Sequence, residues 1–266
     1  MPRRIILHPG FHKTGTTTLQ NTLRRNRAAL KPHMRIVLGG QFRDLQHAAR
    51  GYSTLRDVDT LAKTEVRFAE LMQRQPRMPR RTLLLSSEEL SGHLPGRPGI
   101  PDYSAAVDLA CSYVRILRAV FPKSELRLFY TLRDAASWID SAYWQHVKSS
   151  NMTMDIGEFR DRFASAGNLA AIVDRIGDRT GIPIVTAPMD AWQDGPLGPL
   201  SPLLGQCGVP EAEITALTPA PPTNTRPDAE VMLELLRINR AYADPEARRL
   251  RKAAVLAAQG EDQRDG

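Results

Sequence analysis

The segment from residue 4 to residue 26 constrains the fold of this 266-residue chain more than any other part of the sequence. It begins with the apolar run Ile5-Ile6-Leu7, whose composition favours a short buried strand. A turn that contains Gly10 and Gly15 follows, and beyond it the apolar residues recur with the period of an amphipathic helix. A strand that passes through a glycine turn into a helix is a typical unit of an α/β fold.

The rest of the chain repeats this alternation of strands and helices. Strands are expected at residues 35–38, 82–86, 126–132 and 183–187. Helices are expected at residues 57–73, 104–120, 135–149, 155–179 (with a break near 167), 200–206 and 228–258 (with a break at 244–245). This order predicts a mostly parallel β-sheet flanked by helices on both faces. We expect one domain over residues 1–258 and a charged, frayed tail over residues 259–266.

The turn itself has the chemistry of an anion-binding site; its sequence is His12-Lys13-Thr14-Gly15-Thr16-Thr17-Thr18. Backbone N–H groups in the first turn of a helix lack intrahelical partners, and the helix dipole adds partial positive charge there. Gly15 lets the backbone approach an anion, the threonines add hydroxyl groups, and Lys13 adds a mobile charge. The pattern differs from the loop of ATP- and GTP-hydrolysing proteins, in which lysine directly follows the second glycine.

A second motif follows the strand expected at residues 126–132. That strand ends at Arg133, and Ser141 lies eight positions later on the helix that comes next. The forked guanidinium of arginine suits a phosphate dianion, and a hydroxyl on a helix can fix the orientation of that phosphate. Because ligands of parallel sheets bind at the carboxyl ends of the strands, we expect Lys13 and Arg133 to face one cleft.

Together the two motifs resemble those of the PAPS-dependent sulfotransferases, in the bacterial and polysaccharide-type branch of this P-loop fold. The resemblance covers residues 1–150. In that family a lysine, a small residue, a glycine and two hydroxyl residues hold the 5′-phosphosulfate of PAPS, and an arginine–serine pair holds its 3′-phosphate. The resemblance implies that residues 12–18, Arg133 and Ser141 bind PAPS. It also implies in-line, metal-independent transfer of a sulfuryl group to a hydroxyl, or less often an amine, of a carbohydrate, lipid or small molecule.

Two residues are predicted to act in that reaction. Lys13 is expected to stabilise the leaving group, and Glu88 is expected to take the proton of the acceptor, as a glutamate does in several polysaccharide-type relatives. Glu88 follows the strand at residues 82–86, so it lies at the same sheet edge as the lysine turn. Glu89 and the histidines His12, His93 and His146 are the alternative bases. Alternatively, the two glutamates only occupy the favourable first turn of a helix.

Two other functions stay open at this point. A P-loop nucleotide kinase or NTPase shares the glycine turn, although only Asp134 follows a strand end as a Mg²⁺-holding carboxylate would. A net charge of +7 and a sequence pI near 9.7 also suit a non-enzymatic protein that binds anions or nucleic acid. The chain lacks a helix-turn-helix, zinc or RNA-binding signature, so we expect no nucleic-acid partner. Its two cysteines have no metal-ligand spacing.

The acceptor and the oligomeric state are not encoded in any motif. Acceptor pockets are built from loops, here expected at residues 39–57, 92–103 and 149–159. The basic residues Arg248, Arg249, Arg251 and Lys252 are expected to form a solvated helix face, with an acidic glycan or a membrane surface as the alternative ligand. Residues 223–226 match no family motif, so no role is transferred to them. Without a visible signal peptide or membrane span, a cytoplasmic location is expected.

Overall fold

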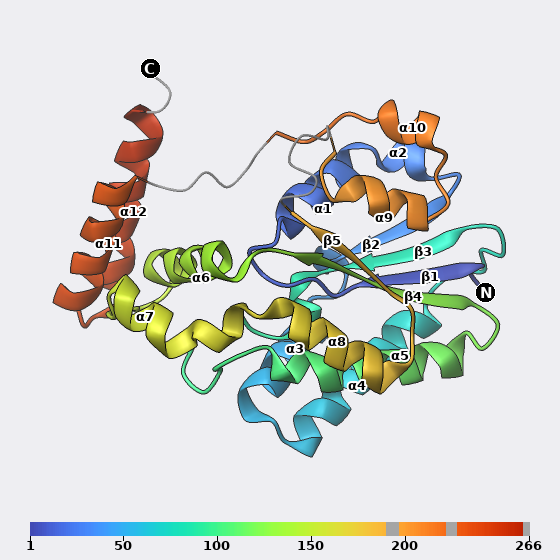
Figure 1. The fold of residues 1–266 in the computed structure, drawn as a ribbon, viewed down its shortest axis with the longest axis horizontal. Helices are drawn as coiled ribbons and strands as arrows, with labels where there is room; N and C mark the ends of the chain where they lie inside the picture. The colour runs from blue at the N-terminus through green and yellow to red at the C-terminus, as the bar shows by residue number, and fades with distance from the viewer. Residues whose placement is uncertain (190–196, 222–227, 263–266) are drawn as a thin grey trace.

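A computed structural model, which describes residues 1–189, 197–221 and 228–262, confirms the predicted α/β fold with a five-stranded parallel sheet. The strand order is β2-β3-β1-β4-β5, and every neighbouring pair is parallel (Figure 1). The strands are β1 (Arg4–His8), β2 (Met34–Leu38), β3 (Thr82–Ser86), β4 (Glu125–Leu132) and β5 (Ile184–Pro188). The carboxyl ends of β1, β3 and β4, the three inner strands, therefore meet at one edge of the sheet.

Helices cover both faces of the sheet (Figure 1). On one face lie α1 (Thr16–Arg25), α2 (Arg27–Leu30), α9 (Leu200–Gln206) and α10 (Glu211–Thr215). On the other lie α3 (Arg43–Leu55), α4 (Val58–Gln73), α5 (Ser104–Val120) and α8 (Leu169–Thr180). Successive side chains of β1 alternate between two apolar cores, with Ile6 in one and Ile5 and Leu7 in the other. The buried strands are apolar on both faces because each face packs against helices.

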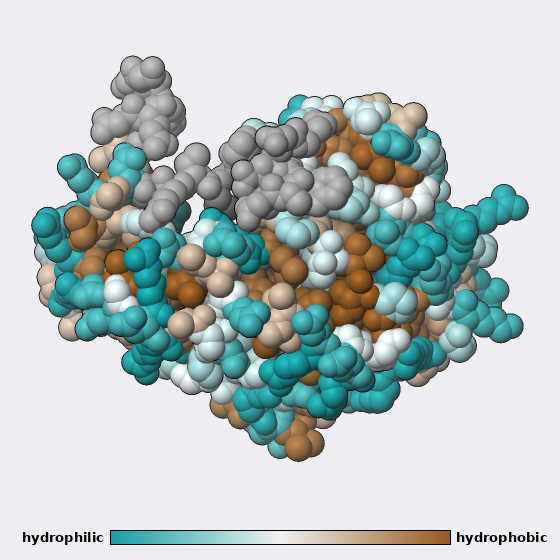
Figure 2. Space-filling view, in the orientation of Figure 1, coloured by the Kyte–Doolittle hydropathy of each residue, from teal (hydrophilic) through white to brown (hydrophobic). Residues whose placement is uncertain are grey.

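A third group of helices lies beyond the carboxyl edge of the sheet, at the left of Figure 1. It consists of α6 (Ala135–Ser149), α7 (Ile156–Phe163), α11 (Ala229–Ala241) and α12 (Pro245–Asp262). Short 3₁₀ turns, η1 (Gly39–Gln41), η2 (Glu88–Ser91) and η3 (Ala164–Gly167), complete the described elements. Figure 2 shows apolar surface over the edge strand β5, between the two helical layers. Within the described residues, no helix has both the length and the apolarity needed to cross a bilayer.

The prediction of a loop over residues 39–57 was wrong, because α3 occupies most of that segment. Its buried residues Leu45, Ala48, Ala49 and Tyr52 follow the i, i+3, i+4, i+7 spacing of a helix that faces a core. Two consecutive glycines before it, at 39 and 40, and a high content of polar residues obscured this pattern in the sequence. The helix brings a basic side chain into the site described below.

The C-terminal residues also differ from the sequence-based expectation. Helix α12 continues to Asp262, and residues 263–266 lie outside the described part of the chain. Lys252 was expected on a solvated basic face, but its side chain is only 6% exposed. Its ammonium donates hydrogen bonds to the carbonyl oxygens of Val147 (2.6 Å) and Ser150 (2.8 Å) and to Oδ1 of Asn239 (2.9 Å). Burial lowers the pKa of Lys252 to about 8.

Replacement of Lys252 by methionine is expected to lower the free energy of unfolding by about 2–3 kcal/mol, because three acceptors in a buried region lose their donor. Asn239 still donates to the Val147 carbonyl, so the loss should stay below that of removing both side chains. Urea unfolding followed by circular dichroism measures the effect. Lys63→Met, on the exposed surface of α4, is the matched control. Equal stabilities of the two variants would contradict the conclusion that the hydrogen bonds of Lys252 stabilise the packing of α12 against the end of α6.

Candidate functional site

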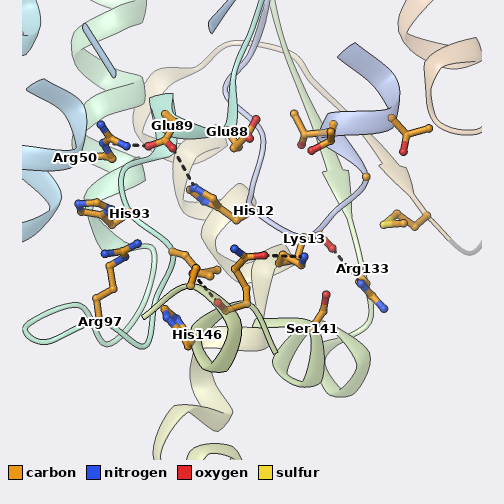
Figure 3. Close-up of a pocket in the computed structure, with 18 residues that line it drawn as sticks. His12, Lys13, Arg50, Glu88, Glu89, His93, Arg97, Arg133, Ser141 and His146 are labelled. Atoms are coloured by element: carbon orange, nitrogen blue, oxygen red, sulfur yellow. Dashed lines mark hydrogen bonds and ion pairs between the residues drawn. The ribbon is translucent and has the colours of Figure 1, made fainter. Parts of the chain in front are cut away.

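A cavity of about 520 Å³ opens at the carboxyl edge of the sheet, where the chain leaves β1, β3 and β4 (Figure 3). Every site residue predicted from the sequence lines it except Thr14. The predicted residues that line it are His12, Lys13, Gly15, Thr16, Thr17, Thr18, Glu88, Arg133 and Ser141. Residues from distant parts of the chain therefore converge there: the β1–α1 turn and the start of α1, α3, η2 and the loop after it, the end of β4, α6 and the end of β5.

The backbone of the β1–α1 turn has an unusual conformation. Lys13 (φ 68°) and Gly15 (φ 83°) both adopt left-handed dihedrals, which residues with a Cβ atom rarely take. The first intrahelical bond of α1 runs from the N–H of Leu19 to the carbonyl of Gly15, at 3.1 Å, and no side chain caps this helix among the described residues. The N–H groups of Thr16, Thr17 and Thr18 thus remain available to an anion.

Thr14 has a structural role in the turn. Its buried hydroxyl donates to the carbonyl of Phe11 at 2.8 Å and accepts from Oγ1 of Thr131 on β4 at 2.7 Å. The side chain therefore ties the turn to the neighbouring strand and does not contact the cavity. This pair of hydroxyls fixes the turn relative to β4, the strand that leads to Arg133.

Two cations meet at the centre of the cavity. Nη1 of Arg133 donates to the carbonyl oxygen of Lys13 at 3.2 Å, and its Nε donates to Oγ of Ser137 on α6 at 2.9 Å. The ammonium of Lys13 donates to Oε1 of Gln145 at 3.3 Å. Burial lowers the pKa of Lys13, and the nearby charges of Arg133 and Lys148 lower it further. Neither Lys13 nor Arg133 forms an ion pair with any acid in the described ranges, so a bound anion would relieve their repulsion.

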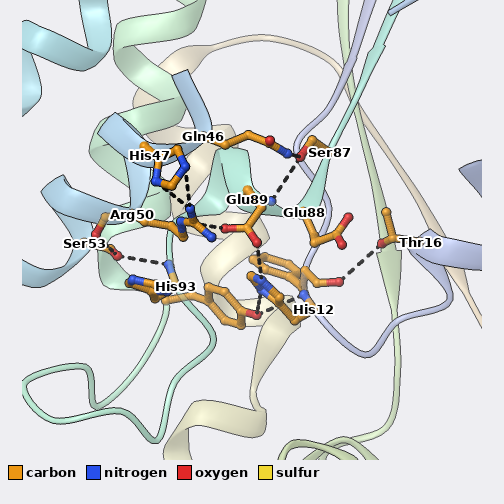
Figure 4. A network of polar contacts seen from close by, with 12 residues as sticks. His12, Thr16, Gln46, His47, Arg50, Ser53, Ser87, Glu88, Glu89 and His93 are labelled. Carbon is orange, nitrogen blue, oxygen red and sulfur yellow. Dashed lines mark hydrogen bonds and ion pairs between the residues drawn. The ribbon is translucent and has the colours of Figure 1, made fainter. Parts of the chain in front are cut away.

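Glu88 and Glu89 line the cavity on the side away from Arg133 (Figure 3), and the surroundings of the two carboxylates differ (Figure 4). Glu89 lies 3.3 Å from Nε of Arg50 and 3.9 Å from Nε2 of His12. Burial alone would raise the pKa of Glu89, but His12, Arg50 and His93 outweigh burial and lower it. Glu88 instead accepts one hydrogen bond, from Nε2 of Gln20 at 3.2 Å. It takes part in no ion pair within the described part of the chain.

His12 belongs to a chain of polar contacts (Figure 4). Its backbone N–H donates to the hydroxyl oxygen of Tyr103 at 2.9 Å, and its Nδ1 lies 3.0 Å from the same oxygen. Burial raises the pKa of Tyr103 well above 10, so the phenol stays protonated. The phenol can then donate to Nδ1, which leaves the proton of a neutral imidazole on Nε2, towards Glu89.

The other two histidines considered as bases have different environments. Burial, with the charges of Arg97 and Arg50, lowers the pKa of His93 to about 4, so His93 is neutral at pH 7. His146 is buried, and its Nε2 donates to the carbonyl of Pro95 at 2.7 Å. A Cβ on Gly96 would lie 2.6 Å from that nitrogen, so the glycine permits this close approach. His146 therefore holds the loop that carries Arg97.

Arg50 and Arg97 also line the cavity, and neither was predicted from the sequence as a site residue. Arg50 was missed because α3 was not recognised, and the helical spacing of the apolar residues of α3 is the signal that would have found it. Arg97 lies within residues 92–103, which were expected to form a pocket wall, but no motif marks it. Residues 223–226 lie outside the described residues.

A scan of the chain against protein-family models gives no match, and a search of curated proteins gives none either. Among the described residues, no three His, Cys, Asp or Glu side chains converge as a metal site.

Proposed function

We propose that this protein is a sulfotransferase that moves a sulfuryl group from PAPS to an acceptor hydroxyl. The observation that carries the proposal is the meeting of Lys13 and Arg133 in one cavity, joined by the hydrogen bond from the guanidinium to the Lys13 carbonyl. The two residues come from connections that are 120 positions apart in the sequence. Two cations brought together, neither of them in an ion pair with an acid of the described residues, favour a ligand with more than one anionic group.

In this proposal the donor substrate is held at two points. The N–H groups at the start of α1, the hydroxyls of Thr16 and Thr17, and Lys13 bind the 5′-phosphosulfate. Arg133 and Ser141 bind the 3′-phosphate from the side of α6 (Figure 3). His12 and Thr18, which line the same turn, border the donor, while Thr14 acts only by shaping the turn.

The acceptor half of the reaction is assigned to the carboxylate side of the cavity. Glu88 accepts the hydroxyl proton as the acceptor oxygen bonds to sulfur, and the bond between sulfur and the phosphate oxygen breaks. The electron pair of that bond goes to the phosphate oxygen, whose charge Lys13 and the backbone N–H groups neutralise. Glu88 is preferred to Glu89 because Glu89 is already paired with Arg50 and His12. The lowered pKa of Lys13 also makes its proton easier to share with the leaving oxygen.

The proposal predicts that adenosine 3′,5′-diphosphate binds about 10–100-fold more tightly than adenosine 5′-monophosphate, without Mg²⁺. This ratio is what charge-assisted hydrogen bonds to one extra phosphate supply. Arg133→Gln should abolish most of the difference, because the 3′-phosphate loses its guanidinium. Calorimetric titration of both nucleotides measures the ratio. Arg175→Gln, on the exposed surface of α8, is the control and should leave it unchanged.

Further titrations, with ATP in the presence and absence of Mg²⁺ and with nucleic acid, separate this proposal from the two alternatives. Tight binding of ATP that requires Mg²⁺, with no preference for a 3′-phosphate, would instead indicate a nucleotide kinase or NTPase. Binding of nucleic acid with strong salt dependence, and no response to adenosine 3′,5′-diphosphate or adenosine 5′-monophosphate, would indicate a non-enzymatic anion-binding protein.

A further inference from the structure

A second cavity, of about 540 Å³, lies next to the first. It is formed between residues 96–101 of the loop held by His146 and residues 150–154, which follow α6. Arg97 lines both cavities. Ser149 lines the first cavity, and the next residue, Ser150, lines the second. The two spaces therefore adjoin along the loop of Arg97 and the end of α6.

The lining of the second cavity is apolar with basic groups at its border. Ile100, Met152, Met154 and Phe163 supply apolar surface. Arg97 and Arg162 supply two exposed guanidinium groups, and that of Arg162 lies 5.7 Å from the centre of the Phe163 ring. Neither arginine makes an ion pair or a side-chain hydrogen bond with another described residue, whereas nine other arginines of the described chain pair with acids. This combination of apolar surface and unpaired guanidinium groups suits a ligand that has an apolar body and an acidic substituent.

The position of this cavity relative to the first determines what can reach it. In Figure 3, Arg97 and Arg133 lie on opposite sides of Lys13. If the donor spans Lys13, Arg133 and Ser141, the remaining approach to Glu88 is from the side of Arg97. A molecule whose hydroxyl reaches Glu88 from that side would extend past Arg97 towards the second cavity.

We infer that the second cavity binds the distal part of the acceptor, and that this acceptor is an amphipathic acid. Its hydroxyl lies at Glu88, its aromatic or alkyl body packs on Met152, Met154 and Phe163, and its acidic group pairs with Arg97 or Arg162. The orientation of the hydroxyl rests on the proposed function, whereas the binding of an acidic amphiphile rests on the second cavity alone.

The test uses two fluorescent probes that differ in one group, 6-hydroxy-2-naphthoate and the neutral 6-hydroxy-2-naphthamide. The full-length protein is titrated with each, with and without adenosine 3′,5′-diphosphate. We expect the naphthoate to bind at least about tenfold more tightly than the amide, as one charge-assisted pairing supplies. Arg97→Gln and Arg162→Gln should each reduce this preference, and Thr153→Trp, which fills the cavity from an exposed position, should weaken both probes. Arg175→Gln should change neither.

Equal affinity for the two probes, no binding of either below about 1 mM, or an unchanged preference in both arginine variants would overturn the inference. So would loss of naphthoate binding in Arg133→Gln alone, because the probe would then occupy the nucleotide half of the first cavity. The proposed function fails separately, if the 3′-phosphate gives no advantage in the nucleotide titrations. Naphthoate binding that depends on Arg162 would survive that failure.

Discussion

Replacement of Lys13 by alanine is expected to lower the rate of sulfuryl transfer by about 10²–10³-fold, the usual effect of losing one preorganised charge-stabilising group. Lys13 is half-buried between Gln145 and the guanidinium of Arg133, so its position is set before any ligand binds. Its charge would offset the negative charge that develops on the phosphate oxygen as the sulfur–oxygen bond breaks. The rate is measured with ³⁵S-labelled PAPS and an acceptor identified from a panel of hydroxyl compounds.

The loss should appear mainly in kcat, because the backbone N–H groups and Arg133 remain to bind the nucleotide. Lys123→Ala is the matched control, since Lys123 is exposed in the turn before β4, at the other end of the strand that leads to Arg133. Calorimetry with adenosine 3′,5′-diphosphate, together with circular dichroism, separates a catalytic effect from a loss of binding or folding. A Lys13→Ala variant that transfers sulfate at the unaltered rate would contradict the role given to this lysine.

Replacement of Glu88 by glutamine is expected to lower kcat by about 10²–10³-fold, within the range for removal of a general base. Glutamine preserves the size of the side chain and can still contact Gln20, so the cavity should keep its shape. Glu89→Gln serves as the neighbouring comparison. Because Glu89 pairs with Arg50 and His12, its loss should lower stability and acceptor affinity more than kcat.

The His12→Gln variant decides between the carboxylate and the imidazole. Tyr103 and Glu89 orient His12, which lines the same cavity as Glu88, so the imidazole is the alternative base that this variant tests. If His12→Gln loses more activity than Glu88→Gln, while adenosine 3′,5′-diphosphate binding stays intact, the proton acceptor is His12. Steady-state rates of the three variants, at saturating donor and over a range of pH, provide this comparison.

Local patterns in the sequence predicted most of the fold. Strands β1 and β3 and helices α5 and α6 lie where their apolar runs and periodicity placed them. These signals are reliable because they depend on residues close in the chain, whose spacing must match the period of a strand or helix. Helix α3 was not predicted because two glycines precede it and polar residues separate its apolar positions.

The basic residues of α12 show a limit of such patterns. Arg248, Arg249, Arg251 and Lys252 are alike in the sequence, yet only Lys252 is buried among the carbonyl groups at the end of α6. A lysine can bury its stem and ammonium only where acceptors from other elements converge. No local pattern records where α12 packs, so the burial of Lys252 was not predictable.

The sequence by itself determined the parallel α/β architecture and the two polar turns at the ends of β1 and β4, because strand periodicity and turn chemistry are local properties. Only the tertiary structure decided which side chains share a cavity. It placed Arg50 from α3 beside Glu89, gave Thr14 a structural contact with Thr131, and set Arg97 between two cavities. The physical reason is that these contacts join residues far apart in the chain, whose meeting depends on how the helices pack on the sheet.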